Sequence, residues 1–118
     1  IENHVEVSRK LQIRAAILDT MWLCLFTRPP FTRNPDLFLP LLKGRYGWDL
    51  AYADVQKMGL DVLETEREFN RRSGAGEEFN DMPEFMREEP LPPMNSVYDV
   101  PMEEMQRIWD VKIPDNIF

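Results

Sequence analysis

Several kinds of residue are scarce in this chain of 118 residues, and each scarcity excludes a class of site. Cys24 is the only cysteine and His4 the only histidine, so we expect no internal disulfide and no zinc site built within the chain. Nothing in the sequence around His4 orients it as the base of a Ser–His nucleophile pair. No glycine-rich phosphate loop is present, and no apolar run approaches the roughly 20 residues of a membrane span. We therefore expect no membrane association and no self-contained metal centre.

Basic residues are also outnumbered, with 14 against 21 acidic ones and a formal net charge of -7. Because nucleic-acid binding depends on clustered Lys and Arg, this balance argues against nucleic acid as a partner. The acidic excess is typical of a solvated surface. A single cysteine and no secretory signal favour a cytoplasmic protein. The first residue is Ile1 and not Met, so we expect a piece cut from a longer polypeptide.

The hydrophobic pattern predicts an all-α protein, an irregular multi-helix domain with a long proline-rich C-terminal arm. We expect one domain over residues 1–118, with a helical core at about 5–74 and the arm and a final helix at 75–118. The final helix should run from about Met102 to Asp110. An arm rich in proline and aromatic residues lies on its own domain or on a neighbour, and the sequence leaves both open.

The first helix is expected over residues 5–26, where apolar residues recur at helical spacing. Its second half, from residue 15 onward, is apolar nearly all round, which predicts burial on every side. Pro29 and Pro30 should end this helix near Thr27, because proline cannot continue a helix.

A short second helix is expected to begin at Asn34, an N-cap candidate followed by Pro35 in the favoured first position. Pro40 lies inside it and could kink it. Gly44 or Gly47 should end it.

The third helix has the clearest pattern. Asp49 is a plausible cap, and an apolar stripe at helical spacing begins at Tyr52 and continues to about Arg72, before Gly74 stops the helix. Gly59 lies in the middle, where glycine costs about 1 kcal/mol relative to alanine. A close crossing with another helix would explain that glycine.

Asp19 is the most informative single residue, because it lies inside an apolar segment. An ionised carboxylate in an apolar site costs several kcal/mol unless it is paired or hydrogen-bonded. A structural ion pair with Arg14 or Arg45 would satisfy it, and so would the donors of a bound molecule. The sequence leaves both alternatives open.

Cys24 follows five residues after Asp19. Five residues of an α-helix turn through about 500°, so the two side chains do not share one face. A lone cysteine is usually a small core residue. By itself it cannot hold a 4Fe–4S cluster, which needs four ligands.

Three later segments resemble the C-terminal part of the aldehyde ferredoxin oxidoreductase family. Residues 59–74 are similar to a stretch in which a Gly precedes a Glu-Arg-x-Phe-Asn run that ends in Arg-x-Gly, with Thr65 at a position that is commonly apolar. Residues 80–85 resemble the family's Asp-x-Leu-Pro element, and residues 89–93 resemble its acidic, proline-rich segment. The order and spacing agree, and the resemblance extends over about residues 15–105.

Residues 19–24, Asp-Thr-Met-Trp-Leu-Cys, resemble the family's Asp-x-x-Gly-Leu-Cys motif. The resemblance implies that Asp19 and Leu23 contact the pterin of a tungsten-bispterin (or molybdenum) cofactor. It also implies that Cys24 is the fourth ligand of a 4Fe–4S cluster. Trp22 departs from the motif, because it stands where the family has Gly.

The resemblance further implies the function of the whole polypeptide. Such an enzyme oxidises an aldehyde-type substrate to the acid and passes electrons through the cluster to ferredoxin. Both cofactors also need N-terminal domains of the same polypeptide, so no catalytic residue is expected among these 118, and the isolated piece should be inactive. We expect it to expose an apolar cofactor-side surface, with homo-oligomers as one way to cover it.

Two hypotheses from other classes remain. A non-catalytic helical interaction module, docking through the proline-rich arm, predicts that Asp19 is paired internally and that Cys24 is inert. A redox subunit that keeps the cluster but has lost the pterin would accommodate the departure at Trp22.

Overall fold

A computed structural model describes residues 3–76, 80–112 and 117–118. Within these ranges the chain is built from helices and contains no strand, which confirms the predicted all-α class. One isolated antiparallel bridge joins Leu91 and Ser96. None of the helices in the described part combines the length and the apolar character that crossing a bilayer requires.

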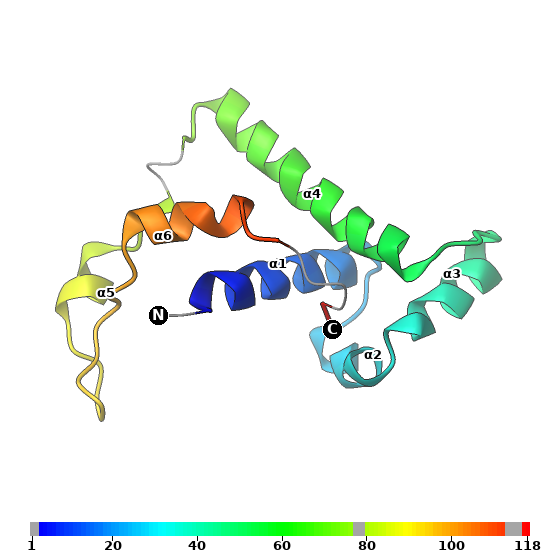
Figure 1. The fold of residues 1–118 in the computed structure, drawn as a ribbon, viewed down its shortest axis with the longest axis horizontal. Coiled ribbons are helices and arrows are strands. Elements are labelled where there is room, and N and C mark those ends of the chain that lie inside the picture. Colours follow the sequence, from blue (N-terminus) through cyan, green and yellow to red (C-terminus); the bar gives the residue numbers. More distant parts are fainter. Residues whose placement is uncertain (1–2, 77–79, 113–116) are drawn as a thin grey trace.

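The fold is organised around the crossing of two long helices, α1 (His4–Thr20) and α4 (Tyr52–Ser73), which pack against each other (Figure 1). Gly59 of α4 is buried at this crossing. A β-carbon added there would lie 2.8 Å from the carbonyl oxygen of Ile13 and 2.7 Å from Cγ1 of Ile17. The close crossing predicted from Gly59 is therefore confirmed.

The end of α4 was also predicted correctly, and its beginning was not. Gly74 ends the helix in the left-handed conformation, with φ 85°. At the start, the Asp54 carboxylate accepts a hydrogen bond from the backbone N–H of Ala51 at 2.8 Å. Asp49 is not the cap, because its carboxylate lies two residues too early and pairs with Lys43 at 2.8 Å instead.

The first helix is shorter than predicted, because it ends at Thr20 and not near Thr27. The chain then turns, forms a short 3-10 helix, η1 (Leu25–Thr27), and enters α2 (Arg28–Arg33). Pro29 and Pro30 occupy the first turn of α2, where a missing N–H costs no hydrogen bond. These prolines thus begin a helix instead of ending one.

The next segment follows the prediction in outline. Asn34 precedes a 3-10 helix, η2 (Pro35–Leu37), with Pro35 in the first position as expected, although the Asn34 side chain makes no capping hydrogen bond. α3 (Phe38–Tyr46) continues directly and ends at Gly47, which has φ 74°.

The core lies between α1, α4 and the segment from η1 to α3. Its centre is an aromatic group in which Phe38 stacks on Phe31 at 4.1 Å between ring centroids and meets Phe118 at 5.1 Å. Ile117 is fully buried beside it. The last described residues of the chain therefore complete the core of its first half.

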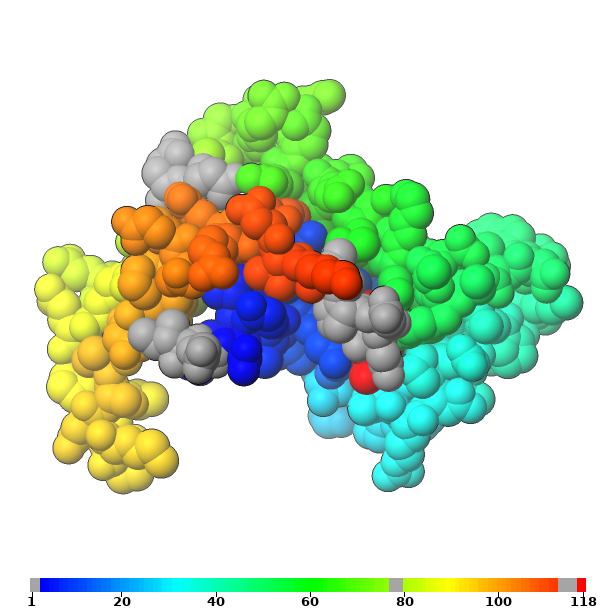
Figure 2. Space-filling view, in the orientation of Figure 1, coloured from blue at the N-terminus to red at the C-terminus, as the bar shows by residue number. Residues whose placement is uncertain are grey.

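The arm contains three short helices, α5 (Glu84–Glu88), α6 (Met102–Gln106) and η4 (Arg107–Trp109), so the predicted final helix is confirmed over most of its length. η4 lies against α1. The arm thus covers its own domain at η4 and at residues 117–118, while the tip around Met94, 86% exposed, stands away from the body (Figure 2).

Candidate functional site

The turn that ends α1 carries the three residues singled out by the sequence. The backbone N–H of Leu23 donates to the Leu18 carbonyl at 2.9 Å, and the N–H of Trp22 donates to the Asp19 carbonyl at 3.0 Å. These two bonds define a Schellman motif, in which the residue after the C-cap adopts the left-handed conformation. Leu23 then packs back on the core cluster that contains Leu18, the hydrophobic contact typical of this motif.

Trp22 is the left-handed residue of this turn, with φ 56°. Glycine is preferred at this position because any β-carbon strains the conformation. Trp22 keeps the turn in spite of its side chain, which is 95% exposed.

The predicted burial of Asp19 is wrong for this chain. Asp19 lies on the exposed side of α1, and no hydrogen bond or ion pair joins its carboxylate to another described residue. Arg14 is engaged elsewhere, since its Nε and Nη2 atoms donate to the Ile117 carbonyl at 2.8 and 2.5 Å. Arg45 lies against the ring of Tyr46. The second half of the predicted helix is buried on one side only, because the chain leaves the helix at Thr20.

Cys24 lies beyond the helix end, as a free and exposed thiol. Its backbone carbonyl accepts bonds from the N–H and the hydroxyl of Thr27, which begin η1. Within the described ranges, no group of three or more His, Cys, Asp and Glu side chains is placed to hold a metal ion. Any metal site that included Cys24 would therefore need ligands from outside these ranges.

Three large apolar side chains close to Asp19 and Cys24 in the sequence are exposed. These three, which we call the α1-end patch, are Trp22, Leu25 and Phe26, exposed by 95%, 64% and 91%. Large apolar side chains with such exposure are typical of surfaces that another molecule covers. The turn thus presents a carboxylate, a thiol and an apolar surface together.

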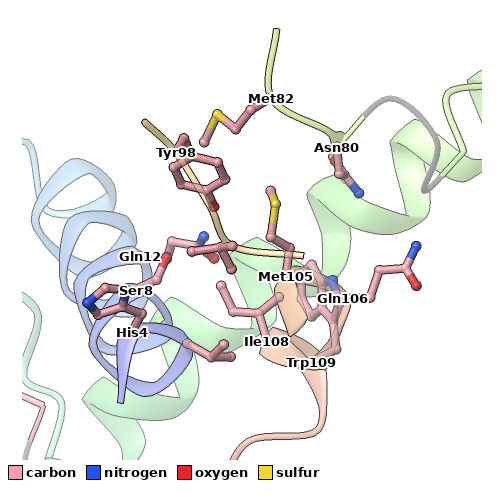
Figure 3. A pocket seen from close by; sticks show the side chains of 12 residues that line it. His4, Ser8, Gln12, Asn80, Met82, Tyr98, Met105, Gln106, Ile108 and Trp109 are labelled. Carbon is pink, nitrogen blue, oxygen red and sulfur yellow. The ribbon is translucent and has the colours of Figure 1, made fainter. Parts of the chain in front are cut away.

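His4 is not part of this site. It lies at the other end of α1, where it lines a cavity of about 440 Å³ with Ser8 and Gln12 (Figure 3). Tyr98 and Met105 of the arm face them across the cavity. His4 is thus separated from Asp19 by almost the whole length of α1, about 22 Å at 1.5 Å per residue.

Arg9 and Trp109 form a contact that was not predicted from the sequence. Arg9 is buried with 4% exposure on α1, and the ring of Trp109 covers its guanidinium. A contact between residues so far apart in the chain leaves no local pattern. Only the aromatic content of the arm suggested that it packs on something.

The structure is thus an all-α protein segment that exposes one carboxylate and one thiol near the end of its first long helix. The family model described as aldehyde ferredoxin oxidoreductase, domains 2 and 3, matches residues 1–109. The chain belongs to the aldehyde ferredoxin oxidoreductase family.

Curated relatives agree with this assignment. The tungsten-containing aldehyde ferredoxin oxidoreductase of Pyrococcus furiosus is 35% identical over 92 residues, which are 76% of this chain and 15% of that protein. Those of Pyrococcus abyssi and Thermococcus kodakarensis are 35% and 33% identical over 65% and 66% of the chain. The matches cover only 12% and 13% of these two proteins. The comparison with solved structures gave no significant match.

Proposed function

We propose that this chain is the C-terminal helical part, one domain over residues 1–118, of a cytoplasmic tungsten (or molybdenum) pterin oxidoreductase. The whole polypeptide would oxidise an aldehyde-type substrate to the acid and pass electrons through a 4Fe–4S cluster to ferredoxin. The observation that carries the proposal is the turn at the end of α1, where Asp19 and Cys24 are exposed with no partner for the carboxylate among the described residues. Membership of the family supports it.

The residues of the turn would form one side of a cofactor-binding site. The Asp19 carboxylate has its acceptor positions open, so it can accept charge-assisted hydrogen bonds from pterin N–H groups. Leu23 is held by its backbone bond to Leu18 and offers an apolar contact. The exposed Cys24 thiol, once deprotonated, can ligate one iron of the cluster. The redox chemistry would come from the cofactors when bound, and the chain would position them.

The remaining ligands would come from N-terminal domains of the same polypeptide, and the isolated 118 residues would be inactive. The α1-end patch would be covered by those domains and the cofactors. A piece without them would cover the patch by forming homo-oligomers.

Metal analysis of the full-length polypeptide that contains this chain, purified without oxygen, tests the proposal. We expect tungsten with about four irons per polypeptide. Asp19→Asn should lower the tungsten content and leave iron in place, whereas Cys24→Ser should remove iron. Asp36→Asn, at another exposed carboxylate, is the matched control and should change neither. Wild-type protein with neither metal would contradict the proposal and support the interaction module.

A redox subunit that keeps the cluster but not the pterin is the second candidate. The exposed indole of Trp22 favours it, because that side chain stands beside the proposed pterin contacts where the family has Gly. Iron without tungsten in the wild-type protein, together with tungsten uptake in Trp22→Gly, would support this candidate. Tungsten in the wild-type protein would exclude it.

A further inference from the structure

Two groups of helices meet at the end of α1. In the α1–α4 group the two long helices pack against each other, and in the η1–α3 group α2 packs on η1 and η2. The chain passes from the first group to the second through residues 21–24 and returns through residues 47–51. Asp19 belongs to the first group, and Cys24 is the residue that precedes η1 in the second. The turn at the end of α1 is thus a connection between the two groups.

The last two described residues, Ile117 and Phe118, lie between these groups. Both side chains are buried, and that of Ile117 is buried completely. Figure 1 places this end of the chain between the end of α1 and α2. The two residues belong to one core cluster with Ile17 of α1 and Phe38 of α3. We call Ile117 and Phe118 the C-terminal pair, and it has neighbours in both groups.

The α1–α4 group binds the backbone of the C-terminal pair. On α1, the buried Arg14 donates from Nε and Nη2 to the Ile117 carbonyl oxygen at 2.8 and 2.5 Å. On α4, burial raises the pKa of Tyr52, and hydrogen bonds with the backbone of Ile117 and Phe118 act in the opposite direction. Hydrogen bonds from a charged donor are strong, and burial shields them from water. The pair is therefore fixed in direction as well as in place.

The η1–α3 group contacts the ring of Phe118. The centroid of this ring lies 5.1 Å from that of Phe38 in α3, a separation typical of favourable aromatic pairs. Phe38 in turn stacks on Phe31 of α2. Cζ of Arg14, from the other group, lies 5.5 Å from the Phe118 centroid. The Phe118 ring is thus in contact with both groups at once.

We propose that the C-terminal pair clamps the two helix groups together and so fixes the position of Asp19 relative to Cys24. Backbone bonds to Arg14 and Tyr52 hold the pair on one group, and the Phe118 ring holds it on the other. Phe118 acts through Phe38, so it is a positioning residue for the turn. The positioning role rests on the proposed function of Asp19 and Cys24, whereas the clamp itself does not.

Hydrogen exchange, measured by mass spectrometry on the full-length polypeptide that contains this chain, tests the clamp. In Phe118→Ala we expect residues 21–38 to exchange about tenfold faster or more, and residues 59–69 of α4 to stay within about twofold. Phe69→Ala is the matched control, because it removes an equal ring that is 70% exposed, and it should leave residues 21–38 unchanged. Unchanged exchange at 21–38 in Phe118→Ala, or an equal increase in both segments, would overturn the clamp.

A conservative variant and a wild-type measurement cover the risk that Phe118→Ala fails to fold. Phe118→Leu keeps a large apolar side chain between the groups and should retain most of the protection at residues 21–38. In the wild type, the peptide that covers residues 117 and 118 should open together with residues 21–38, at a lower urea concentration than residues 59–69. Opening of all three segments at one urea concentration would overturn the clamp, because the pair would then belong to a single cooperative core.

The electron paramagnetic resonance spectrum of the reduced cluster tests the positioning role. Phe118→Ala should broaden the spectrum, because Cys24 would then hold its iron in several geometries, and Phe118→Leu should keep the narrow lines of the wild type. Identical spectra in the wild type and Phe118→Ala would overturn the positioning role. A wild type without a cluster spectrum would overturn the proposed function and the positioning role with it, while hydrogen exchange would still decide the clamp.

Discussion

Gly59 meets Ile13 so closely that a β-carbon at position 59 would lie 2.8 Å from the Ile13 carbonyl oxygen. Real β-carbons do not approach a backbone atom at that distance, so the two helices can cross here only because residue 59 has no side chain. Backbone oxygen cannot swing aside as a flexible side chain can.

Gly59→Ala should therefore destabilise the protein by about 1–3 kcal/mol, although alanine is the better helix former. Gly44→Ala in α3 is the matched control, because nothing lies within 4 Å of its added β-carbon. That control should stabilise by up to about 1 kcal/mol. Urea unfolding of both variants measures the difference, and equal effects at the two glycines would contradict the crossing.

Trp22→Gly should stabilise the protein by about 1 kcal/mol, because it removes a β-carbon from a residue with φ 56°. The indole is 95% exposed, so its loss removes little packing. Trp22→Ala keeps the strain and should stay within about 0.5 kcal/mol of the wild type. Thermal unfolding compares the three proteins, and a Trp22→Gly protein that melts earlier would mean that the turn does not form as described.

Arg14→Met should destabilise the protein by about 1.5–3 kcal/mol, because the Ile117 carbonyl loses two hydrogen bonds from a charged donor in a buried place. The change should also loosen Phe118, whose ring lies 5.5 Å from Cζ of Arg14. Arg45→Met, at an exposed arginine, is the control and should stay within about 0.5 kcal/mol. Hydrogen exchange at residues 117 and 118 should be faster in Arg14→Met than in Arg45→Met. Equal exchange rates in the two variants would contradict the prediction.

The ionised carboxylate of Glu68 should stabilise the folded protein at neutral pH, and this stabilisation should be lost in acid. Hydrogen bonds from Arg71 and Arg72 lower the pKa of its carboxyl from 4.5 to about 2. Because the folded pKa lies below the unfolded one, this stabilisation is complete above pH 4.5 and is lost as the pH falls toward 2.

The stability gap between the wild type and Glu68→Gln should accordingly be present at neutral pH and close on acidification to about pH 2. Glu66→Gln, on the same helix but outside this triad, should show no such closing. Salt should narrow the gap at neutral pH, since all three side chains are well exposed. A gap that is constant with pH would contradict the ion pairs.

The sequence predicted best where a local signal and the tertiary contact agree. The stripe of α4, its stop at Gly74 and the crossing at Gly59 all follow from apolar spacing and from glycine, whose missing side chain has a direct structural meaning. The final helix was predicted because Pro101 marks its start and acidic residues occupy its first turn.

The sequence did not predict the surroundings of the residues that it singled out. No local sequence pattern predicts the turn at Trp22, because the glycine that usually occupies such a turn is absent. The predicted first helix was therefore too long, and Asp19 was wrongly assigned to a buried segment. The role of Asp19, Leu23 and Cys24 came from the family motif and stays a prediction. Arg9 was missed because its burial depends on Trp109, at the far end of the chain.

The bond from Arg14 to Ile117 spans 103 positions of sequence, and this has a consequence for synthesis. While the ribosome is still adding the arm, the Phe38 ring contacts Phe31 but not yet Phe118. One side of the hydrophobic core is therefore still exposed to water. Closing so long a loop is slow compared with forming the helices themselves. The centre of the nascent domain therefore stays open, with its helices already formed, until residues 117 and 118 have left the exit tunnel.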